Sequence, residues 1–319
     1  MNARSVPRAA AAAAAAALAL AVLSACSDSD APDPAAADGP ASVAGVRISK
    51  DRTLHDLLPE RVKEAGRVRV ATDVPYPPFE MYVKEGDSAL TGLDHDLGQA
   101  LGAKLGVTFA FTPQKFDGIV PGIQAGKFDA AMSAITDNEE RQQVVDFVDY
   151  SRSGSAVLVA DGNPEHIAVL DDLCGRKVAV QAATHQLDLL KSRQSACVKA
   201  GRGSIDIQTF PKDSDAQLAL RAGKVVAQLL TKPAAGWVAK TADGGKAFDL
   251  VEDPQAPGGY DATPNGIAVS KQQPGLTTAI QKALQALIDD GTVTKIFEKY
   301  GVASIAVREA TKNAAVDQQ

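Results

Sequence analysis

The chain of 319 residues is 45% hydrophobic and 23% charged, which is the composition of a globular protein rather than a disordered one. Its length exceeds what a single hydrophobic core usually organises, so two domains or lobes are expected and one small module is excluded. The 33 basic residues are outnumbered by 39 acidic ones, and this net charge of -6 argues against a nucleic-acid-binding protein.

The N-terminus has the layout of a secretory signal peptide. Arg4 and Arg8 precede an alanine-rich stretch over residues 9–23, and no acidic residue occurs before Asp28. The stretch is too short and too rich in alanine to indicate a membrane-spanning helix, and no other segment suggests one.

The apolar stretch ends in Leu23-Ser24-Ala25-Cys26, which resembles a bacterial lipobox, where the cysteine receives a diacylglyceryl group before cleavage. We therefore predict a signal peptide over residues 1–25, and a lipidated Cys26 with a flexible tether over residues 26–62. The first part of this tether, residues 28–42, is rich in Ala, Asp, Pro and Ser. The alternative is a soluble secreted protein, cut after an Ala-x-Ala-like site, in which Cys26 is incidental.

Three cysteines are an odd number for an exported chain. If Cys26 carries lipid, Cys174 and Cys197 remain as one pair, and a disulfide can persist outside the cytoplasm. A zinc site is the rival interpretation. It lacks support because the pair has no CxxC spacing and the four histidines form no HxxxH or HExxH pattern. We expect a Cys174–Cys197 disulfide, no metal and no cofactor.

Short β-branched runs alternate with helical patterns from Arg67 onward, which predicts an α/β fold. In the first half we expect strands over residues 68–71, 107–111 and 130–135, and helices over 92–105, with one apolar stripe, and 118–125. The second half repeats the theme, with strands over 177–181, 205–210 and 225–230 and helices over 186–200, 213–222 and from 233. A strand over 267–269 and two helices up to about residue 300 complete the pattern. Two similar lobes are implied.

Four phrases occur in one order, at residues 71–80 (ATDVPYPPFE), 92–97 (GLDHDL), 116–121 (FDGIVP) and 133–141 (SAITDNEER). Together they resemble the family-3 solute-binding proteins of ABC transporters, which collect polar amino acids outside the cytoplasmic membrane. The resemblance runs from about Arg67 to Gly301. It implies a two-lobed periplasmic-binding-protein-like fold, with two hinge strands and a ligand trapped in the interlobe cleft.

The resemblance also implies how the chain is divided. Lobe 1 is expected to comprise residues 63–154 and 268–302, and lobe 2 residues 155–267. Hinges are expected near residues 153–156 and 264–267, and residues 303–319 are expected to form a loose tail.

The last of the four phrases carries groups suited to a carboxylate. Arg141 matches the position where family members bind the ligand α-carboxylate, because a guanidinium offers paired donors; a helix-surface arginine is the alternative. Ser133, Ala134 and Thr136 lie where the family supplies hydroxyls and backbone groups to the same ligand end. Thr136 could instead, or also, cap the following helix.

Two aromatic residues and one acid complete the expected first-lobe site. Tyr76 and Phe116 match positions whose rings sandwich the ligand side chain, although both could be ordinary core aromatics. Asp73 matches an acidic position that in some members receives a basic or amide side chain. An Asp at the end of a strand is also a routine turn former.

The second lobe departs from the family pattern in residues 181–186 (QAATHQ). Thr184 fits the turn that donates backbone and hydroxyl hydrogen bonds at a helix N-terminus. Ala183 replaces the usual glycine and His185 replaces the second hydroxyl residue, so the shape of this turn is open. His185 and Gln186 are included among the expected ligand-binding residues.

Thr231 is the departure that matters most. Members that bind α-amino acids commonly have an aspartate here for the ligand ammonium, which is costly to bury unpaired. Three explanations remain open. Another acid such as Asp73 or Asp261 takes over, or hydroxyls and carbonyls suffice, or the ligand lacks an α-amine or carries an extra anionic group.

The resemblance implies a monomeric, lipid-anchored binding component of an ABC importer on the outer face of the cytoplasmic membrane. It would capture a polar amino acid or related small carboxylate by lobe closure and deliver it to the permease and ATPase complex. It is expected to be no enzyme and to bind no nucleic acid. The alternatives are a dehydratase-like cleft enzyme of the same fold and a ligand sensor without transport.

Overall fold

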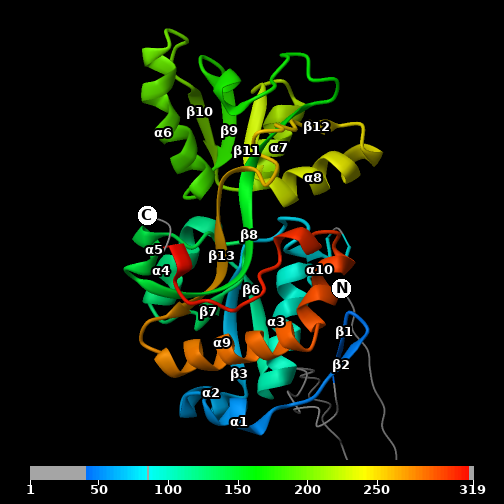
Figure 1. The fold of residues 1–319 in the computed structure, drawn as a ribbon, viewed down its shortest axis with the longest axis vertical. Helices are drawn as coiled ribbons and strands as arrows, with labels where there is room; N and C mark the ends of the chain where they lie inside the picture. The colour runs from blue at the N-terminus through cyan, green and yellow to red at the C-terminus, as the bar shows by residue number, and fades with distance from the viewer. Residues whose placement is uncertain (1–40, 85, 316–319) are drawn as a thin grey trace, which may run out of the picture. The chain divides into compact units, whose positions relative to one another are not determined.

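The computed structural model describes residues 41–84 and 86–315 (Figure 1). Nine strands form one sheet in the order β10-β9-β11-β8-β13-β7-β3-β6, with β12 also paired to β8. The long antiparallel strands β8 (Val145–Ala160) and β13 (Tyr260–Ser270) belong to both lobes and join them. The predicted signal peptide, Cys26 and tether residues 26–40 lie outside the described residues.

Lobe 1 adds three parallel strands to this pair, namely β3 (Arg67–Thr72), β6 (Thr108–Pro113) and β7 (Ala130–Ala131). Helices α3 (Leu93–Leu105), α9 (Pro274–Asp289) and α10 (Thr292–Lys299) pack on one face of the sheet. The short helix α4 (Ile119–Gln124) packs on the other face, and α5 (Glu139–Gln142) precedes β8. Helix α3 buries its leucines along the one stripe that the spacing predicts.

Lobe 2 contains β9 (Lys177–Gln181), β10 (Asp206–Phe210), β11 (Ala227–Thr231) and β12 (Phe248–Leu250). Helices α6 (His185–Lys199), α7 (Asp213–Arg221) and α8 (Lys232–Thr241) enclose two apolar clusters with this sheet. A disulfide joins Cys174, before β9, to Cys197 on α6, as the cysteine count predicts. The α/β fold and the strand and helix order of both lobes are confirmed.

Short elements fill the connections. The strands β4 (Met81–Tyr82) and β5 (Leu90–Thr91) pair with each other. The 3-10 turns are η1 (Phe116–Gly118), η2 (Leu170–Leu173), η3 (Ala242–Gly244) and η4 (Ala303–Ile305). None of the helices in the described ranges combines the length and the apolar character needed to cross a bilayer.

One predicted strand is much shorter than expected. Only Ala130 and Ala131 of the predicted strand 130–135 are in a strand. Ala134 has a φ of +45°, a left-handed conformation that a regular strand does not allow. The chain therefore turns here, and the buried residues 132–137 form a loop beside the cleft.

The tether prediction is wrong for residues 41–62. These residues form β1 (Ala41–Val43), β2 (Val46–Ile48), α1 (Arg52–Asp56) and the start of α2 (Glu60–Ala65). The polar composition that favoured a tether belongs to residues 28–42, whereas apolar residues further along join the core of lobe 1: Val43, Ile48, Leu54, Leu58 and Val62. Burial of these side chains stabilises the segment.

The loose-tail prediction is wrong for residues 303–315. Ala306 and Lys312 each form a bridge with β8, and Ala310 is buried against α9. The segment thus lies along the lobe 1 half of β8, as the red trace before the C-terminus in Figure 1 shows. Residues 316–319 lie outside the described part of the chain.

Candidate functional site

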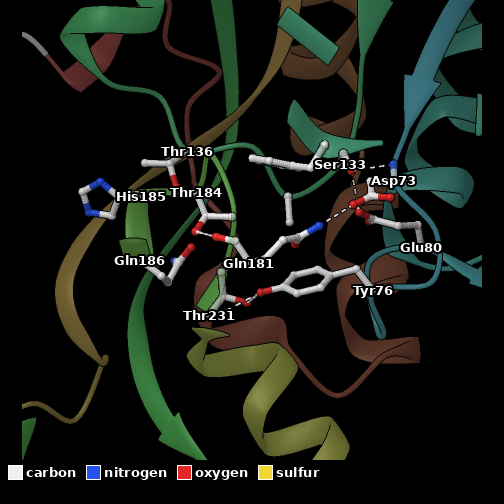
Figure 2. A pocket seen from close by; sticks show the side chains of 12 residues that line it. Asp73, Tyr76, Glu80, Ser133, Thr136, Gln181, Thr184, His185, Gln186 and Thr231 are labelled. Atoms are coloured by element: carbon white, nitrogen blue, oxygen red, sulfur yellow. Dashed lines mark hydrogen bonds between the residues drawn. The ribbon is translucent and has the colours of Figure 1, made fainter. Parts of the chain in front are cut away.

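Strands of both lobes end at one cavity (Figure 2). Asp73 follows β3 closely and Ser133 follows β7, whereas Gln181 and Thr231 are the last residues of β9 and β11. The carboxyl ends of parallel strands are where α/β sheets place their ligands. The space that the side chains leave free here is about 20 Å3, which is room for little more than one water molecule.

Apart from Arg141, every residue predicted to bind ligand lines this cavity. These residues are Asp73, Tyr76, Phe116, Ser133, Ala134, Thr136, Thr184, His185, Gln186 and Thr231. Glu80 and Gln181 line it as well and were missed. Each stands at one end of a phrase that was singled out, and the place of Gln181 at the end of a predicted strand was a usable signal.

The lobe 1 side of the cavity is acidic. Glu80 is 3% exposed, and its Oε1 accepts a hydrogen bond from Ser133 Oγ at 2.7 Å. Ser133 Oγ in turn accepts from the Asp73 backbone N–H at 2.9 Å. Behind Glu80, the fully buried Asp94 accepts from the Ala134 N–H at 2.9 Å. Figure 2 shows Asp73, Glu80 and Ser133 grouped on one side.

Burial without a cation governs the protonation of these acids. Burial, and then the charge of Asp94, raise the pKa of Glu80 well above its usual range. Burial also raises the pKa of Asp94, to about 6, although the hydrogen bond from the Ala134 N–H opposes this shift. For Asp73, burial raises the pKa, against an opposing hydrogen bond from Gln181 and the charge of Lys212. These three carboxyls would all gain from a positive charge nearby.

Polar contacts cross the cleft between the lobes. Gln181 Nε2 of lobe 2 donates to Asp73 Oδ2 at 2.6 Å. The hydroxyl of Tyr76 accepts from the Thr231 N–H at 3.0 Å and lies 2.9 Å from Thr231 Oγ1. The structure is therefore a closed one, in which first-lobe and second-lobe residues of the cavity touch (Figure 2).

The altered turn of lobe 2 keeps a glycine-like shape. Ala183 has a φ of +60°, which is the left-handed region where glycine is usual. Thr184 then caps α6, because its hydroxyl accepts from Leu187 N–H and donates to Gln181 O. His185 Nε2 lies 2.9 Å from Asp261 Oδ2, and Gln186 Nε2 donates to Ser155 Oγ at 3.2 Å.

Arg141 lies beside the cavity and not in it. Its Nη1 donates to the Thr136 carbonyl at 2.7 Å, and its Nη2 crosses to the Ala183 carbonyl of lobe 2 at 2.9 Å. The guanidinium carbon is 5.6 Å from the centre of the Phe116 ring. Arg141 thus lines a groove that adjoins the cavity at Phe116.

One detail of this region differs from what the sequence suggested. Asn138, and not Thr136, caps α5, since its Oδ1 accepts from the Arg141 N–H at 2.9 Å. Lys232, next to Thr231, does not line the cavity, because its Nζ binds Glu252 at 2.7 Å and the Pro257 carbonyl at 3.0 Å.

Acids other than the one expected at position 231 line the cavity. Asp73 and Glu80 line it, whereas Asp261 is exposed and occupied with His185. No Lys or Arg side chain from residues 41–84 or 86–315 lines it. In the same part of the chain, no three His, Cys, Asp or Glu side chains are grouped so as to hold a metal ion.

Two α/β lobes joined by β8 and β13, with a polar cavity at their strand ends, define a two-lobed solute-binding fold. The family model of the bacterial extracellular solute-binding proteins, family 3, matches residues 68–303, and the chain belongs to this family. It is a solute-binding protein of the extracytoplasmic type that serves ABC import.

Relatives with named ligands include two curated proteins. The arginine-binding protein ArgT of Corynebacterium glutamicum is 31% identical over 258 residues, covering 81% of either chain. The L-cystine-binding protein TcyJ of Escherichia coli is 30% identical over 271 residues, covering 83% of this chain and 93% of that protein.

Solved structures give the same fold. An ancestral arginine-binding protein bound to arginine is 34% identical, covers 74% of this chain and 98% of its own, and superposes with a TM-score of 0.64. The ancestral amino acid-binding protein AncCDT-1, described as a precursor of cyclohexadienyl dehydratase, is 32% identical. It covers 78% of this chain and 98% of its own, with a TM-score of 0.63.

Proposed function

We propose that this protein captures an amino acid with a cationic side chain and delivers it to the permease and ATPase of an ABC importer. The observation that carries the proposal is the acidic wall of the cavity, where Asp73 and Glu80 face the lumen with no lysine or arginine among the described lining residues. A buried carboxylate gains most from a cation that replaces its lost water. The arginine-binding names among the relatives support the same ligand class.

The cavity residues would divide the ligand between them. Asp73 would accept hydrogen bonds from the cationic side chain, in place of the one it now receives from Gln181. The rings of Tyr76 and Phe116 would contact the apolar stem. The hydroxyls of Thr231 and Thr184 would accept from the α-ammonium, which explains how the site manages without an acid at position 231.

Arg141 would take the ligand carboxylate. Its guanidinium now binds two carbonyl oxygens, at Thr136 and Ala183, and lies next to the cavity at Phe116. A carboxylate is a stronger acceptor than a carbonyl and offers two oxygens in the geometry of the guanidinium fork. A change of side-chain rotamer would therefore bring Arg141 onto the ligand.

Closure would occur at the crossing strands. The pairing of β8 with β13 shifts register between Tyr260 and Thr263, opposite Ser153, and again between Asn265 and Gly266. Such irregularities locate bending within an otherwise regular ladder. Gly154 and Gly259 approach so closely that a Cβ on Gly154 would stand 2.3 Å from the Gly259 carbonyl carbon. We propose hinges over residues 153–156 and 264–267, with lobe 2 over 155–267 and lobe 1 on either side.

We further propose that Cys26 carries the lipid anchor and that the mature, monomeric chain begins there. A Cys26→Ser variant should leave the membrane fraction and lose incorporation of labelled palmitate in the producing cells. Equal membrane retention of this variant would overturn the anchor without touching the ligand proposal.

A thermal-shift screen tests the ligand class. The purified protein is unfolded, dialysed and refolded to remove carried-over ligand, and is then heated with each polar amino acid and with acids that lack the amine. A ligand that binds only the native state raises the melting temperature. Arginine, lysine or ornithine should give the largest shift. Shifts confined to amine-free or doubly anionic acids would contradict the proposal.

One observation favours a second candidate, a cleft enzyme of the dehydratase type. Glu80 lines the cavity, and burial raises the pKa of its carboxyl, as a general acid requires. Both the Ser133 hydroxyl and Asp94 already engage this carboxyl, which speaks for a fixed structural role. Turnover of cyclic hydroxy acids by the wild type, lost in Glu80→Gln, would establish the enzyme; no turnover is expected.

A further inference from the structure

Residues 311–315, near the C-terminus, have a role that does not follow from the ligand chemistry of the family. We propose that they position Arg141 for the ligand carboxylate, acting through the buried carboxylate of Asp137. The carboxylate role of Arg141 rests on the proposed function, whereas the packing of this segment does not.

The segment is docked on β8 by backbone pairing. The Asp149 N–H donates to the Thr311 carbonyl at 2.9 Å, and the Asn313 N–H donates to the Phe147 carbonyl at 3.2 Å. Asn313 adds side-chain bonds, since its Oδ1 accepts from the Phe147 N–H and its Nδ2 donates to Asp146. Lys312 pairs with Asp146 at 2.9 Å. These bonds fix where the chain runs when it reaches residue 314.

After these paired residues, two successive backbone N–H groups donate to two buried carboxyl groups. The Ala314 N–H donates to Asp149 Oδ2, and the Ala315 N–H donates to Asp137 Oδ2, each at 3.2 Å. Asp149 also accepts from the Thr311 hydroxyl at 3.2 Å. The two acids are 1% and 0% exposed respectively, so each depends on protein donors in place of water.

Asp137 in turn holds the segment that presents Arg141. Its Oδ1 accepts from Gln142 Nε2 at 2.7 Å, which ties it to the end of α5. Its own N–H donates to the Pro264 carbonyl on β13 at 2.9 Å. The residue before it, Thr136, supplies the carbonyl that Arg141 binds, and the residue after it, Asn138, caps α5.

The hydrogen bonds of Asp137 determine what the loss of the Ala315 N–H would change. Without the Ala315 amide, Asp137 Oδ2 loses the protein donor that this structure gives it and would turn toward water. Residues 136–142 would then shift with it, because they share the Asp137 backbone and the Gln142 bond. Arg141 is a positioned residue in this scheme, and Ala315 and Asp137 are positioning residues.

Ala315→Pro tests the proposal, because proline removes the backbone N–H that donates to Asp137. Ala315→Ser is the matched control that keeps the amide. A chain ending at Ala314 is a second variant, in case proline disturbs residue 314. Hydrogen exchange without ligand should show faster exchange over residues 136–144 in Ala315→Pro and in the shortened chain. Ala315→Ser and peptides of lobe 2 should match the wild type.

Arginine affinity is the second readout. Because residues 136–142 would no longer hold Arg141 in place, Ala315→Pro should weaken arginine binding about tenfold. The unpaired oxygen of Asp137 should also lower the melting temperature by a few degrees. Binding of agmatine, which lacks the carboxylate, should not change. In an Arg141→Lys background, Ala315→Pro should have little further effect on arginine affinity, because both changes act on one interaction.

The outcomes separate this proposal from the proposed function. Wild-type exchange over residues 136–144 in both Ala315→Pro and the shortened chain would overturn the positioning role, whatever the ligand. An equal loss of arginine and agmatine affinity would overturn it too, since that would indicate general damage to the site. Faster exchange without any arginine binding by the wild type would contradict the proposed ligand class alone.

Discussion

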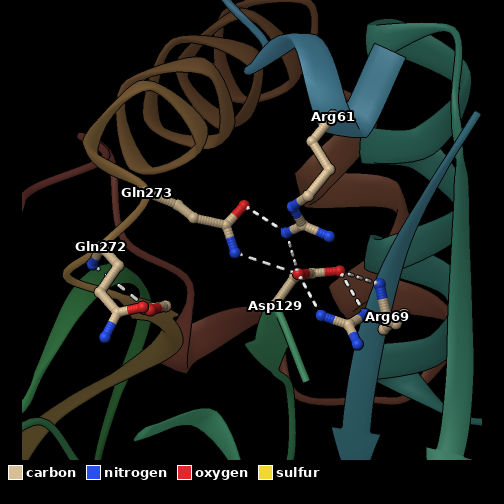
Figure 3. A network of polar contacts seen from close by, with 6 residues as sticks. Arg61, Arg69, Asp129, Gln272 and Gln273 are labelled. Carbon is tan, nitrogen blue, oxygen red and sulfur yellow. Dashed lines mark hydrogen bonds and ion pairs between the residues drawn. The ribbon is translucent and has the colours of Figure 1, made fainter. Parts of the chain in front are cut away.

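Lobe 1 buries acids at both ends of its parallel strands, and the two groups behave in opposite ways. Asp129 precedes β7 and is met by Arg69, Arg61 and Gln273 (Figure 3). Glu80 and Asp94 lie at the other end, beside the cavity, where no lysine or arginine from residues 41–84 or 86–315 pairs with them. Burial alone would raise the pKa of either group.

Hydrogen bonds and charge decide the difference. At Asp129, burial raises the pKa, but the bonds from Arg69 and Arg61 outweigh it and hold the pKa well below its usual range. At Glu80, burial and the charge of Asp94 act in the same direction and raise the pKa. The carboxylate of Asp129 is paired with arginine side chains, and this site stabilises the fold. The second lacks a positive charge, and we infer that the ligand supplies it.

Asp129→Asn should have the largest effect on stability. The carboxylate also accepts from the Arg69 N–H at 2.9 Å, so the change breaks several bonds at once and should cost about 3 kcal/mol of unfolding free energy in urea titrations at pH 7. Arginine affinity should remain that of the wild type. A stability loss with an equal loss of affinity would show that the two ends of the sheet are not independent.

The stability lost in Asp129→Asn should depend on pH. A carboxyl whose folded pKa is lowered stabilises the protein above its unfolded pKa, about 4, and this stability is lost as the pH falls through the folded value. Asp129→Asn should therefore lose more stability relative to the wild type at pH 7 than at pH 3. A constant difference across this range would contradict the ion-pair assignment.

Asp73→Asn should have the largest effect on binding. Loss of the charge should weaken arginine binding by about 30-fold, because a charge-assisted bond becomes a neutral one. Unfolding free energy without ligand should hardly change or should rise, since burial disfavours the charged form of Asp73. Measuring the unfolding free energy and the arginine affinity on one preparation checks this prediction. A loss of unfolding free energy larger than the loss of binding free energy would show that Asp73 stabilises the fold and does not bind the ligand.

Glu80→Gln should mainly change how the unfolding free energy depends on pH. Glu80 has a raised folded pKa, so the folded state binds more protons and the unfolding free energy falls as the pH rises above about 4, toward the folded value. Glutamine carries no proton to lose and still accepts from Ser133, so this part of the slope should flatten. Unfolding curves of the wild type and the variant between pH 4 and pH 9 measure it, and identical slopes would contradict a protonated Glu80.

Ala183→Gly should have the smallest effect. The left-handed backbone of Ala183 costs a non-glycine residue about 1 kcal/mol. Glycine avoids this cost, but its greater flexibility stabilises the unfolded chain and cancels part of the gain. A gain of about 0.5 kcal/mol in unfolding free energy is expected. Ala182→Gly is the matched control and should destabilise. A loss in both variants would show that the turn carries no strain.

Much of the site could be predicted because strand ends and short phrases mark it in the sequence. Asp73 and Thr231 follow predicted strands, Ser133 lies within one, and all three line the cavity. Glu80 was missed because its burial depends on the fold around Asp94 and Ser133 and not on any local pattern. The place of Arg141 beside the cavity depends on its rotamer, which no sequence pattern encodes.

The chain ends were predicted least well. The tether prediction extended the polar composition of residues 28–42 as far as residue 62, and the tail prediction rested on the position of residues 303–319 at the end of the chain. The order of residues 41–62 and 303–315 comes from contacts distant in sequence, such as Val43 in the lobe 1 core and Asn313 on Phe147. Contacts of this kind have no periodicity that a sequence pattern could reveal.

The most direct test is calorimetry of the refolded wild type with arginine and with citrulline, its uncharged isostere. The two ligands share the α-amine, the carboxylate and nearly the same shape, so only the side-chain charge differs. Arginine should bind at least about 100-fold more tightly, because no lysine or arginine of the described residues lines the acidic wall. Equal affinities, or a preference for citrulline, would contradict the claim that the unpaired carboxyls select a cationic ligand.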